Sequence, residues 1–297
     1  MNTIIAPAYP YDGSSSLIVR TYLSTSYLTS AALLARKAYA IEVVAVRLPE
    51  SAPILVDEME IVERIGVLQR TEHHAYASSA IVMSALGLEA FVNELFADCE
   101  AAGAGNLFGL SGDQAEKLAL VWSPPQLSSE HGSSRKKYAD FERESALRKY
   151  DRVLTALNLP ALDKSAKPVM AMRTLMELRH ALAHYKLAAH TAGEQGERSA
   201  LSKLEEELQQ YFVDHDQPIH NPMTGEHNSY FPDRVIGHAV AEWSVQTAVA
   251  FLLHVQARLS VTPRQGDRWP TTDMEMTRFE ERDAASNPTA DVSPRWS

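Results

Sequence analysis

The sequence reads LRHALAH over residues 178–184, and this is the stretch whose residues point most directly to a chemistry. Its leucines recur at helical spacing and Pro168 suits a first helical turn, so we predict a helix from there to about residue 189. Five positions separate Arg179 from His184, which sets these side chains about 140° apart around a straight helix. His180 and His184 are four positions apart and share one face.

On both sides of this helix, apolar residues recur at helical spacing through most of the chain. We predict further helices over residues 24–47, 113–122, 138–157 and 201–212, and a last one that Asp233 caps. Residues 41–48 are rich in β-branched side chains and are also compatible with a short strand. Residues 54–101 predict either two helices or one long helix bent near Gly66 or Gly87, and the small residues over 78–87 would permit a close helix neighbour.

These helices predict an all-α protein built as an antiparallel bundle. We place the bundle at residues 54–260. Residues 1–53 form a partly helical N-terminal extension, whose proline- and serine-containing first 16 residues are expected to be irregular. Residues 261–297 turn polar after Pro263 and are expected to form a flexible tail.

Composition narrows the class of protein. The chain has 297 residues and a formal net charge of −10, which argues against a broad, non-specific DNA binder. One cysteine, Cys99, permits neither an intrachain disulfide nor a thiolate metal cage, and its acidic neighbours make it a poor nucleophile. The first ten residues do not resemble a signal peptide, and the most apolar window, 239–255, is shorter than a membrane span. We therefore expect a cytoplasmic protein without a membrane partner.

The surroundings of residues 178–184 resemble the HEPN superfamily of small helical bundles. Its hallmark is an Arg, an adjacent polar residue and a His four to six positions after the Arg, matched here by Arg179, His180 and His184. The segments ALGLEAFVNELF (85–96) and AVAEWSVQTAVAFL (239–252) are also similar to members of that group, in order and spacing. The resemblance covers residues 54–260. The residue after the Arg is most often Asn in the family, and here it is His180.

This resemblance implies a metal-independent endoribonuclease that acts as a dimer, often in toxin–antitoxin or phage-defence settings. It implies RNA, a second copy and, in a toxin pair, an antitoxin protein as partners, with no metal and no cofactor. Attack by the RNA 2′-hydroxyl needs a base, an acid and a cation for the phosphate. Our hypothesis is that His184 is the base or acid, Arg179 binds the scissile phosphate, and His180 assists. Since Arg179 and His184 do not share a face, either Arg179 curls around the helix or a second copy completes the site.

Two other functions are compatible with the same residues. One is a non-catalytic HEPN-like regulatory or interaction module. The other is a metal-dependent hydrolase, because His180 and His184 have the spacing of two zinc ligands on one helix face. Ala181 stands where the metalloprotease motif requires Glu, which argues against peptidase chemistry.

Several other residues are weaker candidates. Glu89 and Asn93, one turn apart, would either hold the guanidinium of Arg179 or satisfy other half-buried polar groups. Residues 133–167 are locally basic; they offer either an RNA-contact surface or an ordinary solvated helix face, and the RNA-binding candidates are Arg135, Lys136, Lys137, Arg148 and Lys149. Asp214, His215, Asp216, His220 and His227 form a weak candidate metal cluster, and we interpret His73 and His74 as a solvated helix face.

Overall fold

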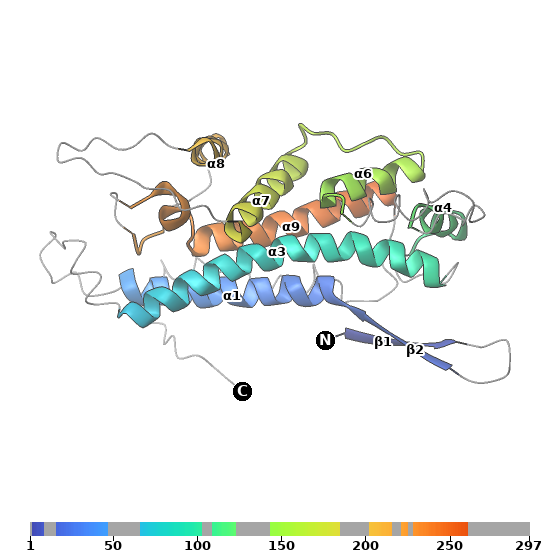
Figure 1. Ribbon diagram of the computed structural model, residues 1–297, viewed down its shortest axis with the longest axis horizontal. Coiled ribbons are helices and arrows are strands. Elements are labelled where there is room, and N and C mark those ends of the chain that lie inside the picture. Colours follow the sequence, from blue (N-terminus) through green and yellow to red (C-terminus); the bar gives the residue numbers. More distant parts are fainter. Residues whose placement is uncertain are drawn as a thin grey trace, which may run out of the picture.

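A computed structural model describes residues 2–8, 16–46, 66–102, 109–122, 143–184, 202–215, 221–224 and 228–260. Figure 1 shows the long helices Leu23–Val46, Val67–Ala102 and His238–Leu259 running side by side, with shorter helices placed around them. The described elements, in chain order, are β1 (Asn2–Ala8), β2 (Ser16–Tyr22), α1 (Leu23–Val46), α3 (Val67–Ala102), α4 (Gly112–Trp122), α6 (Ala146–Ala156), α7 (Lys167–Ala183), α8 (Lys203–Asp214), the π-helical turn η2 (Tyr230–Arg234) and α9 (His238–Leu259). The prediction of a mostly helical protein is confirmed.

The core lies between α1, α3 and α9, which pack against one another, with α7 against α9 and α3. Alanines at the contact of α1 and α3, such as Ala31, Ala35 and Ala80, are fully or almost fully buried. A Cβ atom built on Gly87 would lie 2.7 Å from Cγ of Leu28, so this position on α3 has room only for glycine. The small residues of α3 therefore permit a close neighbour, as the sequence predicted, and that neighbour is α1.

The first 53 residues supply one of the central helices of this core. We placed this segment outside the bundle, but Leu28, Ala31 and Ala38 of α1 are 0% exposed within the shared core. The expectation of irregular structure over residues 1–16 was also wrong for β1, which pairs with β2 in antiparallel register from Asn2 opposite Tyr22 to Ala8 opposite Ser16. β-Branched residues favour pairing on both strands, and Pro7 is tolerated because each strand of a two-stranded sheet is an edge strand.

Several predicted helix boundaries shift. α3 is one helix that begins after Gly66 and continues through Gly87, so the two-helix alternative is excluded from Val67 onward; residues 54–65 lie outside the described residues. α6 begins at Ala146 after the N-cap Ser145, later than predicted. Gly237 and not Asp233 is the N-cap of α9, because η2 precedes it. The predicted tail over residues 261–297 lies outside the described residues.

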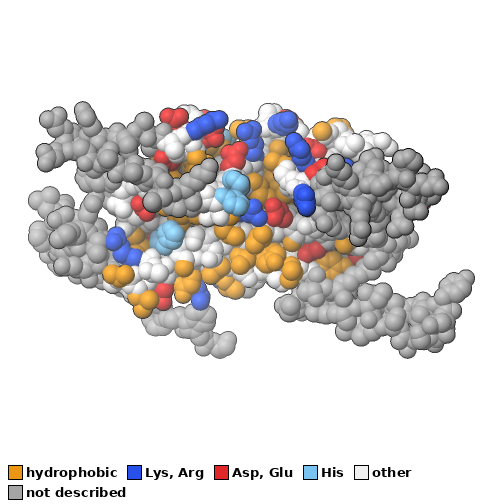
Figure 2. All heavy atoms as spheres, in the orientation of Figure 1, with side chains coloured by type: hydrophobic (Ala, Val, Ile, Leu, Met, Phe, Trp, Pro, Cys, Tyr) orange, Lys and Arg blue, Asp and Glu red, His pale blue; other side chains and the backbone are white. Residues whose placement is uncertain are grey.

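α3 is the one described helix long and apolar enough, by length and composition alone, to cross a membrane. Its most apolar window is 56% buried inside the bundle, and the core helix of a protein without a membrane passes the same test. Hydrophobic side chains also reach the surface over α1 and α3, in the lower middle of the face in Figure 2. The exposed large apolar residues of these two helices are Leu23, Leu33, Val44, Val67 and Leu68.

Candidate functional site

The helix α7 presents an apolar side to the core and a polar side outward. Pro168 occupies its first turn, as predicted, and Met172, Leu175 and Leu178 are 0% exposed against the core. The buried positions repeat every three to four residues, so the intervening residues, including Arg173 and His180, must face outward. This amphipathic pattern determines where the reactive side chains of the helix stand.

His180 and His184 lie together at the C-terminal end of α7. Their rings are 4.7 Å apart between centroids and inclined by 49°, and both residues are exposed. His184 is the C-cap and its backbone N–H donates to the carbonyl of His180 at 2.9 Å, so α7 ends at Ala183, about six residues earlier than predicted. The shared face expected from their spacing is therefore observed. An imidazole can act as a general acid or a general base, so this exposed pair offers both roles.

Arg179 is directed toward α3. Its Nη2 lies 3.5 Å from Oε2 of Glu89, and the two side chains are 29% and 34% exposed. Such a long contact between half-exposed groups holds the guanidinium only loosely. Glu89 thus contacts Arg179, as one of the two interpretations of this residue predicted. The structure brings His180 and His184 together and ties Arg179 to a different helix.

Asn93, one turn after Glu89, has a different partner. Its Oδ1 accepts a hydrogen bond of 2.9 Å from Nζ of Lys149, a residue of α6 that is only 6% exposed. Lys149 was a candidate for RNA contact, but it faces the bundle interior because Asn93 provides a partly buried acceptor there. Arg148 is exposed, and Arg135, Lys136 and Lys137 lie outside the described residues.

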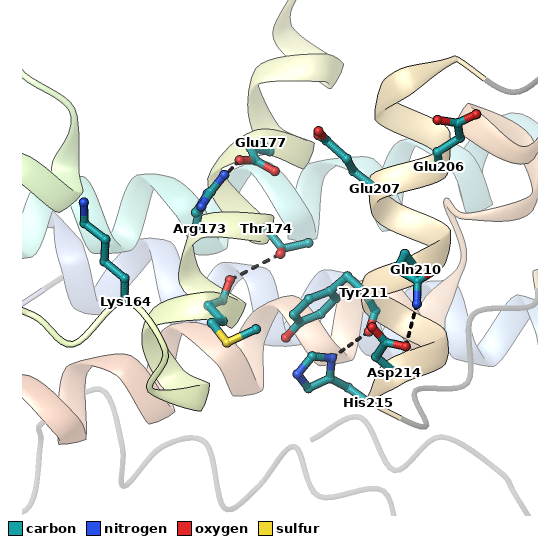
Figure 3. A pocket seen from close by; sticks show the side chains of 11 residues that line it. Lys164, Arg173, Thr174, Glu177, Glu206, Glu207, Gln210, Tyr211, Asp214 and His215 are labelled. Atoms are coloured by element: carbon teal, nitrogen blue, oxygen red, sulfur yellow. Dashed lines mark hydrogen bonds and ion pairs between the residues drawn. The ribbon is translucent and has the colours of Figure 1, made fainter.

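A groove runs between α7 and α8 (Figure 3). Its volume is about 550 Å³, within the size range of small-molecule sites. Arg173 and Glu177 stand on the α7 wall, with their side chains 3.1 Å apart, and Tyr211 and His215 project from α8 into the space opposite. The residues that line it are Lys164, Met170, Arg173, Thr174, Glu177, Glu206, Glu207, Gln210, Tyr211, Asp214 and His215.

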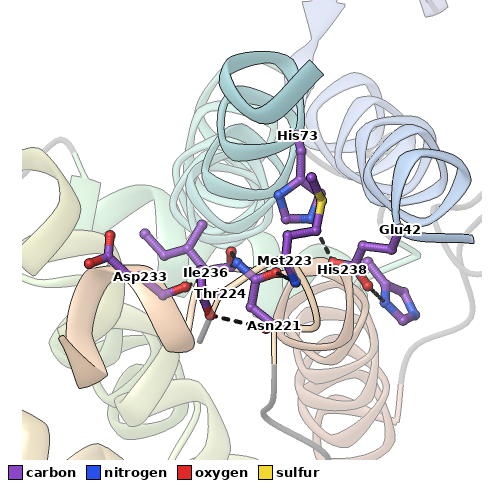
Figure 4. A network of polar contacts seen from close by, with 8 residues as sticks. All are labelled: Glu42, His73, Asn221, Met223, Thr224, Asp233, Ile236 and His238. Atoms are coloured by element: carbon purple, nitrogen blue, oxygen red, sulfur yellow. Dashed lines mark hydrogen bonds and ion pairs between the residues drawn. The ribbon is translucent and has the colours of Figure 1, made fainter. Parts of the chain in front are cut away.

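A buried polar cluster centres on Glu42 of α1, which sequence reasoning missed (Figure 4). The Glu42 carboxylate, 4% exposed, contacts Nε2 of His73 and Nδ1 of His238, each at 2.6 Å. It also accepts the backbone N–H of His238 at 2.8 Å. Burial opposes ionisation of this carboxyl, but the hydrogen bonds from His238 and His73 outweigh it and lower the pKa of Glu42 from 4.5 to about 2.

This cluster joins three helices, because Glu42, His73 and His238 belong to α1, α3 and α9. The interpretation of His73 as part of a solvated face was wrong: it is 2% exposed, while His74 beside it is exposed. One signal was available, since a carboxylate in the apolar stretch Ile41-Glu42-Val43-Val44 must find a buried partner. Gly237 leaves space for it, as a Cβ there would lie 3.2 Å from Oε1 of Glu42.

The metal-ligating side chains and the thiol are weaker candidates for a functional site. Among the described residues no group of three or more His, Cys, Asp or Glu side chains is placed to hold a metal ion. Asp214 accepts a hydrogen bond from Gln210, and Asp216, His220 and His227 lie outside the described residues. Burial, reinforced by the charge of Asp98, raises the pKa of the Cys99 thiol to about 12, which confirms it as a poor nucleophile.

The chain was compared with known proteins. No protein-family model matches it, and neither a curated protein nor a solved structure shows significant similarity to it.

Proposed function

We propose that this protein is a HEPN-type endoribonuclease that cleaves RNA without a metal ion. The observation that carries the proposal is the exposed pair of imidazoles, His180 and His184, at the end of α7. Arg179, the residue directly before His180, is held only loosely by Glu89. Such a pair supplies proton transfer, and the guanidinium supplies a phosphate ligand. These three side chains are also the ones that match the hallmark of the HEPN superfamily, an Arg, an adjacent polar residue and a His.

In the proposed reaction one imidazole removes the proton of a ribose 2′-hydroxyl, and the oxygen attacks the adjacent phosphorus. The bond from phosphorus to the 5′-oxygen breaks, and an imidazolium returns a proton to that leaving oxygen. The products are a 2′,3′-cyclic phosphate and a 5′-hydroxyl. Arg179 stabilises the charge on the phosphate oxygens, for which it exchanges its 3.5 Å contact with Glu89 for a closer one with the phosphate.

The proposal includes a symmetric dimer. Within one chain, Arg179 points toward Glu89 of α3, and five positions on a helix set it about 140° away from His184. A second copy whose α7 end packs against the first would instead bring its own Arg179 beside His184. We place this dimer in the cytoplasm as a toxin or phage-defence nuclease, where an antitoxin protein would be a natural regulator.

The proposal is tested by incubating the purified chain with a labelled single-stranded RNA in the presence of EDTA. We expect cleavage at an unchanged rate, with fragments that end in a 2′,3′-cyclic phosphate. Cleavage that disappears with EDTA would favour a metal-dependent hydrolase, and no cleavage with or without metal would favour a non-catalytic module. Both outcomes contradict the proposal.

A further inference from the structure

The groove between α7 and α8 exists because α8 is attached to the bundle along one side only. Glu205, Leu208 and Phe212 of α8 are buried at intervals of three and four residues. Oε1 of Glu205 accepts the backbone N–H of Phe231 at 3.1 Å, and the ring of Phe212 meets that of Trp243 at 5.0 Å. The remaining surface of α8 faces the groove or the solvent, and the opposite wall is the outward side of α7 (Figure 3).

The groove combines a partly apolar interior with acidic walls. The thioether of Met170 and the ring of Tyr211 supply apolar surface, and the Tyr211 ring stacks on that of His215 at 4.3 Å. Four carboxylates line the space, from Glu177, Glu206, Glu207 and Asp214, against two cations, Lys164 and Arg173. The lining therefore carries an excess of two negative charges, in a chain whose net charge is −10.

Two of these carboxylates, Glu177 and Glu207, have only weak ion-pair partners within the chain. The Arg173–Glu177 pair is 70% and 39% exposed, and Nζ of Lys203 stands 3.6 Å from Oε1 of Glu207 with both side chains largely exposed. Exposed ion pairs of this kind contribute little to stability, because water screens them and ordering two long side chains costs entropy. An incoming cation can therefore replace them at little cost.

The groove also leads toward the histidine pair. Its α7 wall is made by Met170, Arg173 and Glu177, at spacings of three and four residues. The same spacing continues to His180 and His184 on an α-helix. A molecule lying along the α7 wall would thus end beside the two imidazoles.

We propose that this groove docks a basic, amphipathic segment of a partner protein, with its lysines or arginines against the carboxylates and an apolar side chain on Met170 and Tyr211. Charge complementarity selects this occupant: a phosphate backbone would face four carboxylates and be repelled. The docked segment would also lie against His180 and His184 and control access to them. This docking proposal does not depend on the nuclease activity, because the binding of a peptide to the groove can be measured without any RNA cleavage.

The probe for this proposal is a fluorescein-labelled peptide that repeats Leu-Lys-Lys-Leu, titrated with the intact chain and followed by fluorescence anisotropy. We expect the double variant Glu206→Gln, Glu207→Gln to weaken binding about three- to tenfold. Arg173→Glu should tighten binding by a similar factor, because it removes a competing cation from the groove. The matched control is Asp113→Asn, Glu116→Gln on α4, which changes the chain's charge equally at exposed positions and should leave the affinity unchanged.

Three results would overturn the proposal. The first is that the peptide does not bind. The second is that the groove and α4 variants weaken binding equally, which would indicate non-specific attraction to an acidic protein. The third is that a labelled RNA binds instead and Arg173→Glu weakens that binding, which would assign the groove to nucleic acid. Circular dichroism of each variant confirms that the fold is intact.

Discussion

Replacing His184 by Ala is expected to lower the rate of RNA cleavage at least about a hundredfold, the typical contribution of a general acid or base. The change should leave the fold intact, because His184 is exposed at the end of α7 and its helix-capping bond is made by its backbone N–H. The rate is measured on a single labelled RNA under single-turnover conditions. His184→Gln should be equally inactive, since an amide cannot exchange a proton near neutral pH.

The matched control is His74→Ala, which removes an exposed imidazole from α3. It should cleave at the wild-type rate. A His184→Ala protein that is folded and cleaves within about threefold of wild type would exclude this residue as the proton-transfer group.

Replacing Glu42 by Ala should strongly destabilise the fold. It leaves the imidazoles of His73 and His238 and one backbone N–H without their buried acceptor. The lowered pKa of Glu42 corresponds to about 3 kcal/mol, and breaking a buried charged pair typically costs a similar amount. We expect the free energy of unfolding, measured by urea denaturation, to fall by about that value. Glu72→Ala, one residue before His73 and partly exposed, should change it by less than about 0.5 kcal/mol.

The same carboxylate predicts how stability depends on pH. The pKa of Glu42 is about 2 in the folded chain and 4.5 ordinarily, so its contribution is complete above pH 4.5 and is lost as the pH falls from there toward 2. The wild-type protein should therefore lose more stability in this window than Glu42→Ala does. Parallel pH profiles for the two proteins, or a Glu72→Ala variant as unstable as Glu42→Ala, would contradict the role assigned to the cluster.

The sequence predicted the helices better than their assembly. Pro168 marked the start of α7, and apolar periodicity located α1, α4 and α8 to within about two residues. The end of α7 at Ala183 was missed because no glycine or proline follows directly to mark it. The pairing of β1 with β2 was missed because the prolines and serines of the first 16 residues favoured irregular structure, and Pro7 argued against a strand.

Only those contacts of the candidate site that are made within one helix could be predicted from the sequence. The pairing of His180 with His184 follows from a four-residue spacing on one helix. The partners of Glu42, Lys149 and Arg179 all lie on other helices, so single-sequence periodicity could not assign them. Glu89 and Asn93 illustrate this: one turn apart on α3, they contact side chains from two different helices, α7 and α6.

The proposal that two subunits complete each other's site is tested most directly by co-expressing Arg179→Ala and His184→Ala chains with different tags and isolating the mixed dimer. Each variant alone should be inactive. If Arg179 of one subunit works with His184 of the other, the mixed dimer contains one intact site and one doubly altered site, and should cleave RNA at about half the wild-type rate per dimer. A mixed dimer that stays inactive, beside a wild-type dimer that cleaves, would show that the two residues do not act across the interface.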